Sequence, residues 1–180
     1  MKSIFKLVAL VLVLATTSAQ AGLLVEPVLG FNVNSKLESD TIDTKGLGAS
    51  YGGRLGYQNY GFQIGLDYLK SSIDMDEDAF KNNVKQTDWG AFVGFEFPIL
   101  VRVYAGYIFS AKGEVSTDFG KAKMEGTGTK VGVGFTGLPF VDINVEYRRG
   151  TYDDVKIGGV DSDDTDFSSL MLGVSLPLNL

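Results

Sequence analysis

Apolar and polar residues alternate along most of the chain, and the alternation is clearest between Trp89 and Ser110. Before Pro98, every second residue from Trp89 to Phe97 is apolar, and the same pattern resumes from Val101 to Phe109. Alternation with a period of two residues is typical of a β-strand. Proline cannot donate a ladder hydrogen bond, so we expect Pro98 in the connection between two strands. This stretch therefore predicts a hairpin of two long strands.

Further segments of the chain show the same alternation and predict an all-β protein with eight antiparallel strands. The expected strands are residues 23–34, 46–57, 62–68, 89–97, 101–110, 126–136, 141–148 and 169–178. Short connections at 58–61, 98–100 and 137–140 alternate with longer polar segments, which are expected to be loops. These loops are residues 36–45, 70–86, 111–125 and 149–164, with a helical turn expected within Glu77–Val84. An even number of strands places both ends of the barrel domain on the same side.

Each expected strand has one apolar face and one face of glycine and charged residues. A soluble lipocalin-like barrel would bury the apolar face, but its interior would then be an apolar cup and its polar face would not need glycine. A transmembrane up-and-down barrel points the apolar face at lipid and the other face into a narrow lumen. Aromatic residues near both ends of the apolar faces agree with the second arrangement, because membrane interfaces select them.

The face expected to point into the lumen carries charges of both signs. These residues are Glu26, Arg54, Asp67, Asp88, Glu96, Arg102, Lys130, Asp142, Glu146 and Arg148. The carboxylates are candidates for an acid–base site, but interspersed basic residues favour a structural network of ion pairs, since buried charges must be paired. With a three-residue turn at Pro98–Leu100, the register sets Glu96 opposite Arg102, and this pair is expected to form.

Composition narrows the choice of functions. The chain has 180 residues, no Cys and no His, which removes thiolate chemistry and the commonest general base. Its formal charge of −6 argues against a nucleic-acid partner. Residues 1–21 have the form of a secretory signal peptide, with Lys2 and Lys6 before an apolar segment and Ala19-Gln20-Ala21 as the cleavage site. The alternative, an N-terminal membrane anchor, would need about 20 apolar residues.

From Gly22 to Leu180 the chain resembles the small eight-stranded outer-membrane β-barrel proteins of Gram-negative bacteria, the OmpA-like and OmpX-like group. The resemblance lies in the architecture described above, because no short diagnostic motif supports it. It implies a monomer in the outer membrane, without a cofactor, surrounded by lipopolysaccharide and other outer-membrane lipids. It also implies periplasmic chaperones and the barrel assembly machinery as partners during biogenesis. This chain ends in Pro-Leu-Asn-Leu rather than in the usual Phe or Trp.

Two functional classes follow from this resemblance. The enzymes among such barrels, which modify lipid A or cleave peptides, are expected to rely on a histidine that this chain lacks. We therefore expect a non-enzymatic structural protein that interacts with surface partners through its acidic loops. The alternative is a narrow pore or a carrier of small ligands. Clustered carboxylates in the acidic loops are candidate oxygen ligands for Ca²⁺ or Mg²⁺, and the alternative is a solvated loop. The acidic run Asp161–Asp166 lacks the glycine and the closing glutamate of an EF-hand, so no metal site is assigned.

Overall fold

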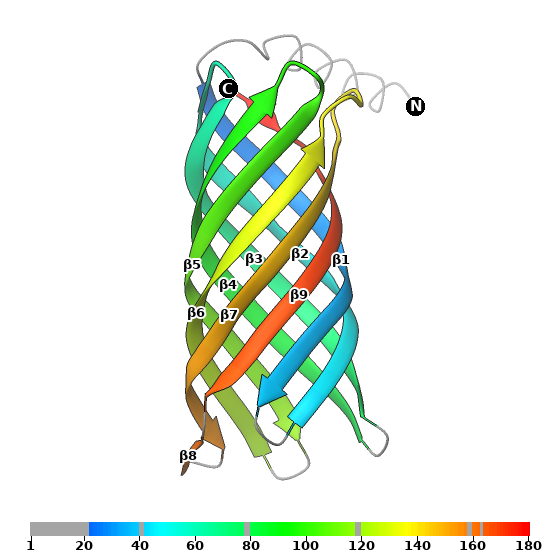
Figure 1. The fold of residues 1–180 in the computed structure, drawn as a ribbon, viewed down its shortest axis with the longest axis vertical. Coiled ribbons are helices and arrows are strands. Elements are labelled where there is room, and N and C mark those ends of the chain that lie inside the picture. Colours follow the sequence, from blue (N-terminus) through cyan, green and yellow to red (C-terminus); the bar gives the residue numbers. More distant parts are fainter. Residues whose placement is uncertain (1–21, 40–41, 78–79, 118–119, 158–159, 163) are drawn as a thin grey trace, which may run out of the picture.

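The computed structural model describes residues 22–39, 42–77, 80–117, 120–157, 160–162 and 164–180, and in these residues the strands form a closed antiparallel barrel (Figure 1). The wall of the barrel has eight strand positions, which we call staves. Strands β1 to β7 form seven of them, and β9 forms the eighth, with the short strands β8 and β10 beside it. This confirms the expected all-β, eight-stranded, up-and-down architecture. Neighbouring strands pair in sequence order, and β9 closes the barrel by pairing with both β1 and β7. The strands are β1 (Gly22–Ser39), β2 (Ile42–Asn59), β3 (Phe62–Glu77), β4 (Phe80–Phe97), β5 (Val101–Thr117), β6 (Gly120–Phe135), β7 (Asp142–Ile157), β8 (Val160–Ser162), β9 (Thr165–Ser175) and β10 (Leu178–Asn179).

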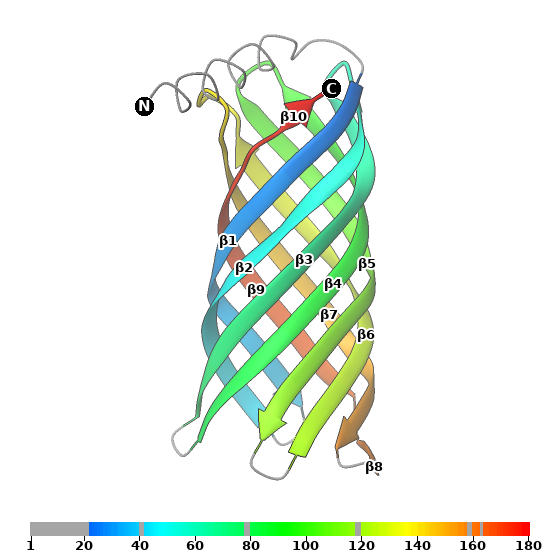
Figure 2. The same cartoon turned by 180° about the vertical axis from the view of Figure 1, so that it is seen from behind.

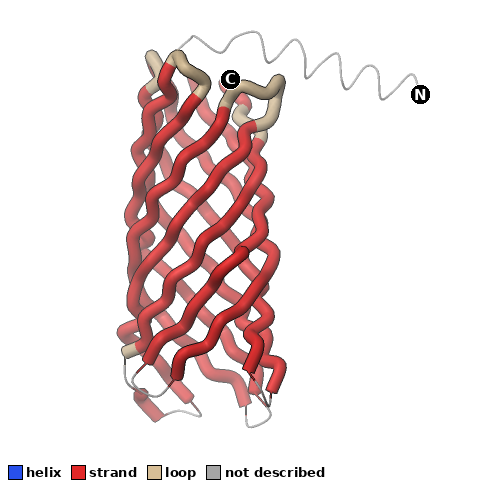
Figure 3. Tube along the Cα trace, turned by 45° about the vertical axis from the view of Figure 1, so that its right-hand side comes forward, coloured by secondary structure: helices blue, strands red, loops and turns tan. Residues whose placement is uncertain are grey.

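The two ends of the described barrel differ in their connections. Gly22 and Leu180 lie at one end, where the backbone amides of Leu23 and Leu180 donate to each other's carbonyl oxygens at 2.9 Å (Figure 2). The three predicted short turns lie at this same end, which we call the terminal end. We call the opposite end the hairpin end (Figure 3). No helix that could cross a membrane occurs in the part of the chain that the structure describes.

The four polar segments expected to be loops are mostly strand, and this part of the prediction was wrong. Only two residues separate β1 from β2, β3 from β4, β5 from β6, and β7 from β8. The helical turn expected near Glu77 was also wrong, since β4 already begins at Phe80. Strands β1 to β7 each contain 16–18 residues, whereas a tilted strand needs about 9–11 to cross a membrane.

The extra length at the hairpin end has the opposite polarity from the rest of the barrel. Ile73, Val84 and Met124 point inward and are buried, while neighbours such as Asp74 and Lys123 are exposed. This is the arrangement of a soluble barrel, with apolar residues inside and polar residues in water. We call this half of the barrel, from the level of Tyr51 and Tyr147 to the hairpin end, the barrel extension. Its polar outward residues made the sequence look like loops.

Three strands that run toward the hairpin end contain irregularities that shift their inward face. In β1 the shift lies between Asn32 and Ser35, in β5 between Ile108 and Ala111, and in β7 it lies opposite Glu125 and Gly126. A β-bulge inserts one residue and reverses the alternation beyond it. For this reason Asn34, which uninterrupted alternation from Leu23 would place in the lumen, is exposed.

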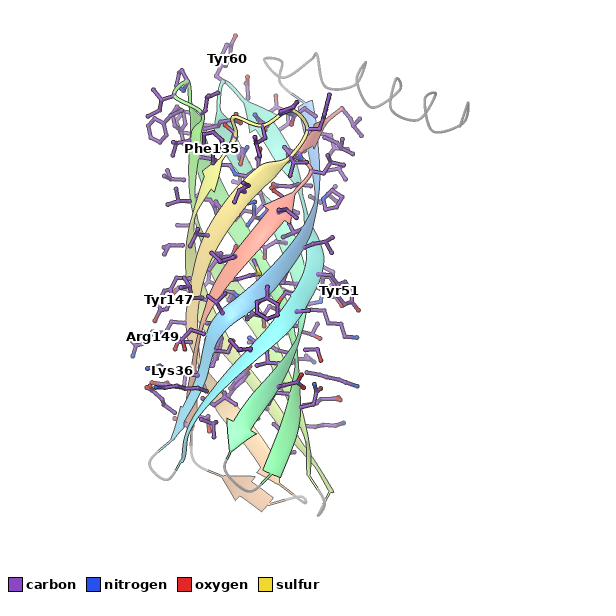
Figure 4. The ribbon with its side chains drawn as sticks, turned by 90° about the vertical axis from the view of Figure 1, so that its right-hand side faces the viewer. Lys36, Tyr51, Tyr60, Phe135, Tyr147 and Arg149 are labelled. Carbon is purple, nitrogen blue, oxygen red and sulfur yellow. The ribbon has the colours of Figure 1, made fainter. Side chains whose placement is uncertain are left out.

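The outward face nearer the terminal end is apolar and is bounded by aromatic residues. Figure 4 shows Tyr60 and Phe135 near the terminal end, and Tyr51 and Tyr147 about halfway along the barrel. The rings of Tyr68 and Trp89 contact each other in a tilted arrangement, with 4.8 Å between ring centroids, and those of Phe62 and Phe95 meet edge to face at 4.7 Å. The exposed residues between these two levels are mostly aliphatic, among them Leu29, Leu55, Ile64, Val93, Val133, Val145 and Leu172. Such a band is what a transmembrane barrel turns toward lipid.

Candidate functional site

The lumen is the candidate site, because alternating strands carry most of the predicted charged residues into it. Nine of the ten are buried: Glu26, Arg54, Asp67, Asp88, Arg102, Lys130, Asp142, Glu146 and Arg148. They come from seven of the eight staves, so most of the contacts between them link different strands. Glu26 has no exposed surface and Arg102 is only 1% exposed.

Glu26 and Arg102 form a bidentate ion pair in the lumen. Arg102 on β5 donates from one guanidinium nitrogen to Glu26 Oε1 at 2.6 Å and from the other to Oε2 at 3.0 Å. This two-pronged geometry is the strongest arrangement of an arginine and a carboxylate. The same guanidinium donates to Asn144 Oδ1 at 2.8 Å and lies 3.5 Å from Asp142 Oδ2. Arg102 therefore joins strands on opposite sides of the barrel.

From Glu26 a continuous series of ion pairs runs along the lumen. Arg54 lies 3.3 Å from Glu26 and donates to Glu146 at 2.9 Å. Arg148 lies 3.6 Å from Glu146 and donates to Asp88 at 3.0 Å. Acidic and basic groups thus alternate from Asp142 through Arg102, Glu26, Arg54, Glu146 and Arg148 to Asp88. Lys130 and Asp67 form a separate ion pair beside this series.

Inward glycines leave the space that these long side chains occupy. Gly132 lies directly opposite Tyr104, and a Cβ atom at Gly132 would overlap the Tyr104 ring. The Tyr104 hydroxyl donates to Glu146 Oε2 at 2.9 Å, and the Arg54 guanidinium lies 4.1 Å from the centre of the ring. The small residue on one strand therefore lets a large one on the next strand support two charges of the network.

The expected pair of Glu96 and Arg102 does not form, although the predicted register is correct. The two residues are direct cross-strand partners. Arg102 instead reaches across the lumen to Glu26, where it satisfies a carboxylate that is fully removed from water. Glu96 is only partly buried and accepts a long hydrogen bond from Gln58 Nε2 at 3.4 Å. The partly buried carboxylate of Glu96 is accessible to water near the terminal end, whereas the buried carboxylate of Glu26 depends on arginine for its hydrogen bonds.

Beyond the ion pairs, toward the hairpin end, the lumen holds a layer of amide and hydroxyl groups. Asn32 accepts from Arg148 at 2.8 Å and from the Ser169 hydroxyl at 3.0 Å, and its amide donates to Ser50 Oγ at 2.7 Å. Ser50 and Ser71 share a further hydrogen bond of 2.7 Å. Period-two alternation also places Asn32, Tyr104 and Asn144 on the inward face, but alternation alone does not reveal a hydrogen-bond partner.

The interior of the barrel extension is filled by apolar side chains. Ile108, Ala111, Met124, Tyr152 and Phe167 form one buried cluster, and Tyr152 and Phe167 stack at 4.8 Å between ring centroids. Burial raises the pKa of the Tyr152 hydroxyl well above its usual value, so this residue stays neutral. A smaller cluster of Ile73 and Val84 lies alongside, and Leu37 and Val115 pack against both. The lumen therefore changes from ionic to polar to apolar along the barrel.

Acidic residues of the extension make local contacts. Asp74 accepts from Asn83 Nδ2 at 2.8 Å, and Asp166 accepts from the Thr151 hydroxyl at 2.7 Å. Asp76 to Asp78 and Asp161 to Asp163 include positions outside the residues or side chains that the structure describes. Among the described residues, no group of three or more acidic side chains is placed to hold a metal ion.

The closed barrel, its apolar outward band and its charged lumen define the class of a transmembrane β-barrel. The model of the outer membrane protein beta-barrel domain matches residues 7–176 of this chain. The chain belongs to that family, and its place is accordingly the bacterial outer membrane. The signal peptide expected in residues 1–21 lies outside the described residues and stays a prediction. No curated protein sequence matches this chain.

Solved structures show the same fold at low sequence identity. The crystal structure of Neisserial surface protein A is 21% identical, with a TM-score of 0.59, and the match covers 87% of this chain and 97% of that one. The attachment invasion locus protein Ail of Yersinia pestis, in complex with the heparin analogue sucrose octasulfate, is 16% identical, with a TM-score of 0.61. That match covers 87% of this chain and 99% of Ail. At these identities the likeness concerns the fold.

Proposed function

We propose that this protein is a non-enzymatic outer-membrane barrel that does not conduct solutes and presents its extension to partners outside the cell. The observation that carries this proposal is the change of polarity along the barrel. Up to Tyr51 and Tyr147 the outward face suits lipid, and beyond them it suits water (Figure 4). Strands β1 to β7 are each about 5–9 residues longer than a membrane crossing needs. Such a rigid, water-exposed structure is suited to recognition.

The filled lumen supports a closed barrel over the alternative of a narrow pore. Eight strands leave an interior that side chains can fill, whereas porins with water-filled channels have about 16–18 strands. Arg54, Arg102 and Arg148 each bridge the lumen between acidic groups, and the apolar cluster around Tyr152 follows. A hydrated ion would have to break the ion pairs and then cross a dry apolar layer.

The purified protein should therefore show no stable unit conductance in planar lipid bilayers. The control is the variant Tyr152→Ala/Phe167→Ala, which empties part of the apolar cluster and keeps the ion pairs. If the ionic half closes the barrel by itself, this variant also stays silent, and if the apolar cluster is needed, it conducts. Reproducible single-channel steps of the wild-type protein, or solute uptake in liposome swelling, would replace this proposal with the pore.

The charge of the hairpin segments points to a basic partner. The sequence at the hairpin end is rich in carboxylates, with Asp40 and Asp43, then Asp76 to Asp78, then Asp161 to Asp164. Attraction between complementary charges speeds association and excludes partners of like charge. The structure of Ail contains a polyanion, sucrose octasulfate. For the present chain we propose the opposite preference, a protein surface with clustered Lys and Arg.

Binding to immobilised probes tests this preference. The protein in nanodiscs of zwitterionic lipid should bind a lysine-rich peptide and not heparin, and binding should weaken with salt. Replacing Asp161, Asp163 and Asp164 with Asn should reduce peptide binding about tenfold, while Lys112→Gln/Lys123→Gln should not reduce it. Equal binding of heparin would contradict the proposal. Orientation is checked separately, since a cysteine at Ser72 should react with an impermeant maleimide on intact cells and one at Asn59 should not.

A further inference from the structure

A groove lies on the outside of the barrel between β7, β9 and β1, directly on the hairpin side of Tyr147. Its volume is about 210 Å³, and Lys36, Tyr147, Arg149 and Ser168 contribute to its walls. In Figure 4, Lys36 and Arg149 follow Tyr147 toward the hairpin end. On the membrane placement proposed above, the groove opens where the lipid headgroups of the outer leaflet begin.

The strand register brings the two basic residues of the groove together. Ser168 on β9 is the direct partner of Arg149 on β7 and of Lys36 on β1. Lys36 and Arg149 therefore flank a small hydroxyl-bearing residue. One guanidinium, one ammonium and one hydroxyl group, spaced across three strands, form a cradle of donors for the oxygen atoms of a phosphate.

The acidic residues of the groove hold these cations only loosely. Lys36 Nζ lies 3.7 Å from Glu38, and an Arg149 guanidinium nitrogen lies 3.9 Å from Asp166. Both distances exceed those of hydrogen bonds, and exposed pairs of this kind contribute little. Asp166 has a shorter contact of its own with Thr151 at 2.7 Å. Lys36 and Arg149 thus keep donors for a ligand.

Beyond the aromatic residues, the outward face begins with a basic residue on most other strands as well. On six staves the first outward charge beyond the aromatic residues is basic: Lys36 on β1, Lys45 on β2, Lys70 on β3, Lys85 on β4, Lys112 on β5 and Arg149 on β7. Acidic residues follow one or two outward positions farther toward the hairpin end, as Glu38, Asp74, Glu114 and Asp153. The chain carries a net charge of −6, so an excess of basic residues at these positions is not a consequence of composition.

We propose that this groove binds the phosphate-bearing headgroup of a glycolipid in the outer leaflet. Lys36 and Arg149 contact the phosphate, and Ser168 donates between them. The acyl chains then lie along Tyr147, Val145 and Leu172, which are exposed on the adjoining apolar face. The lipid is favoured over soluble phosphate because the groove adjoins this face. The inference rests on the membrane placement of the proposed function and is independent of any protein partner.

Lipid binding to the purified barrel tests the groove. In nanodiscs of zwitterionic lipid, wild-type protein should bind bisphosphorylated lipid A and should not bind lipid A from which both phosphates have been removed. Lys36→Gln/Arg149→Gln should weaken binding of the bisphosphorylated form about tenfold or more, as expected for two lost phosphate contacts. Lys121→Gln/Lys123→Gln removes the same charge on β6 closer to the hairpin end, and should leave binding within about twofold. Both variants should keep the wild-type unfolding midpoint.

Three results would overturn the groove. An equal loss in the two double variants would show that binding follows overall charge. Wild-type binding of the dephosphorylated lipid would show that the acyl chains alone suffice. Full competition by millimolar inorganic pyrophosphate would show that the site recognises soluble phosphate. None of these results depends on whether the lysine-rich peptide binds, so the lipid site and the protein partner are judged separately.

Discussion

Replacing Arg102 with alanine should lower the free energy of unfolding by about 3–5 kcal/mol, which is the usual cost of removing one partner of a buried ion pair. The reason is the position of Glu26. Its carboxylate has no exposed surface and receives its two shortest hydrogen bonds from Arg102. Without Arg102, the ion pair that Glu26 would keep among the described residues is that with Arg54, at 3.3 Å. Urea unfolding of the refolded barrel in lipid vesicles measures the effect.

Three further variants show whether the loss comes from Glu26. Adding Glu26→Gln to Arg102→Ala should restore part of the stability, because the unpaired charge is removed. Glu96→Gln should have a small effect, since Glu96 makes no ion pair among the contacts of the described residues. Lys112→Ala breaks the exposed pair of Lys112 and Glu125 at 3.2 Å and should cost about 0–1 kcal/mol. An unfolding midpoint of Arg102→Ala equal to that of the wild type would contradict the argument.

Placing a charge on the apolar band should be nearly as costly. Val93 lies on the outward face of β4, halfway between Trp89 and Phe97, and its cross-strand neighbours are Ile64 and Ala105. Val93→Arg should destabilise the barrel by about 2–4 kcal/mol, because an arginine near the middle of the bilayer has no water to solvate it. The measurement is again urea unfolding in lipid vesicles.

The matched control lies on the same strand, in the barrel extension. The control position is Asn83, which lies directly opposite Asp74, and the Asp74 carboxylate could pair with an arginine introduced there. Asn83→Arg should therefore change stability by no more than about 0.5 kcal/mol. If both variants were equally stable, the boundary between lipid and water would not lie where Tyr51 and Tyr147 place it. If both were equally destabilised, the extension would be in lipid as well.

The architecture was predictable because the physical signal repeats on every strand. Alternation with period two, such as that from Trp89 to Phe97, identified the strands and their inward face. Pro98 and the turn Gly137–Phe140 fixed the short connections. The glycines had to point inward because the lumen of an eight-stranded barrel is narrow. The register of the β4–β5 hairpin followed from the three-residue turn alone.

The sequence analysis missed the barrel extension because the polarity of the two strand faces reverses there while the strands themselves continue. The segment Ala111-Lys112-Gly113-Glu114-Val115 also alternates, but with its apolar residues inward. Read with the polarity of the membrane part, such a segment looks like a polar loop. The irregularity between Ile108 and Ala111 adds to this difficulty, because it shifts the phase at the point where the polarity reverses. Period-two analysis of one strand cannot detect such a shift.

The lumen contacts were only partly accessible from the sequence for a different reason. Pairing rules relate residues on neighbouring strands, and they set Glu96 opposite Arg102. The guanidinium of Arg102, at the end of three methylene groups, reaches beyond the neighbouring strand. It pairs with the carboxylate that is most completely removed from water. That carboxylate is Glu26, which lies on a strand that does not pair with β5.

The closed sheet limits how a partner can attach to the extension. Among the described strands, only β8 and β10 have a single neighbour, and they contain three and two residues. Strand addition needs a longer free row of backbone amides and carbonyls. The proposed recognition then depends, in the described strands, on outward side chains, which contribute to neither the backbone ladder nor the apolar interior. Mutations of these outward side chains can alter binding preferences without changing the barrel, so related barrels can diverge in what they recognise far faster than in shape.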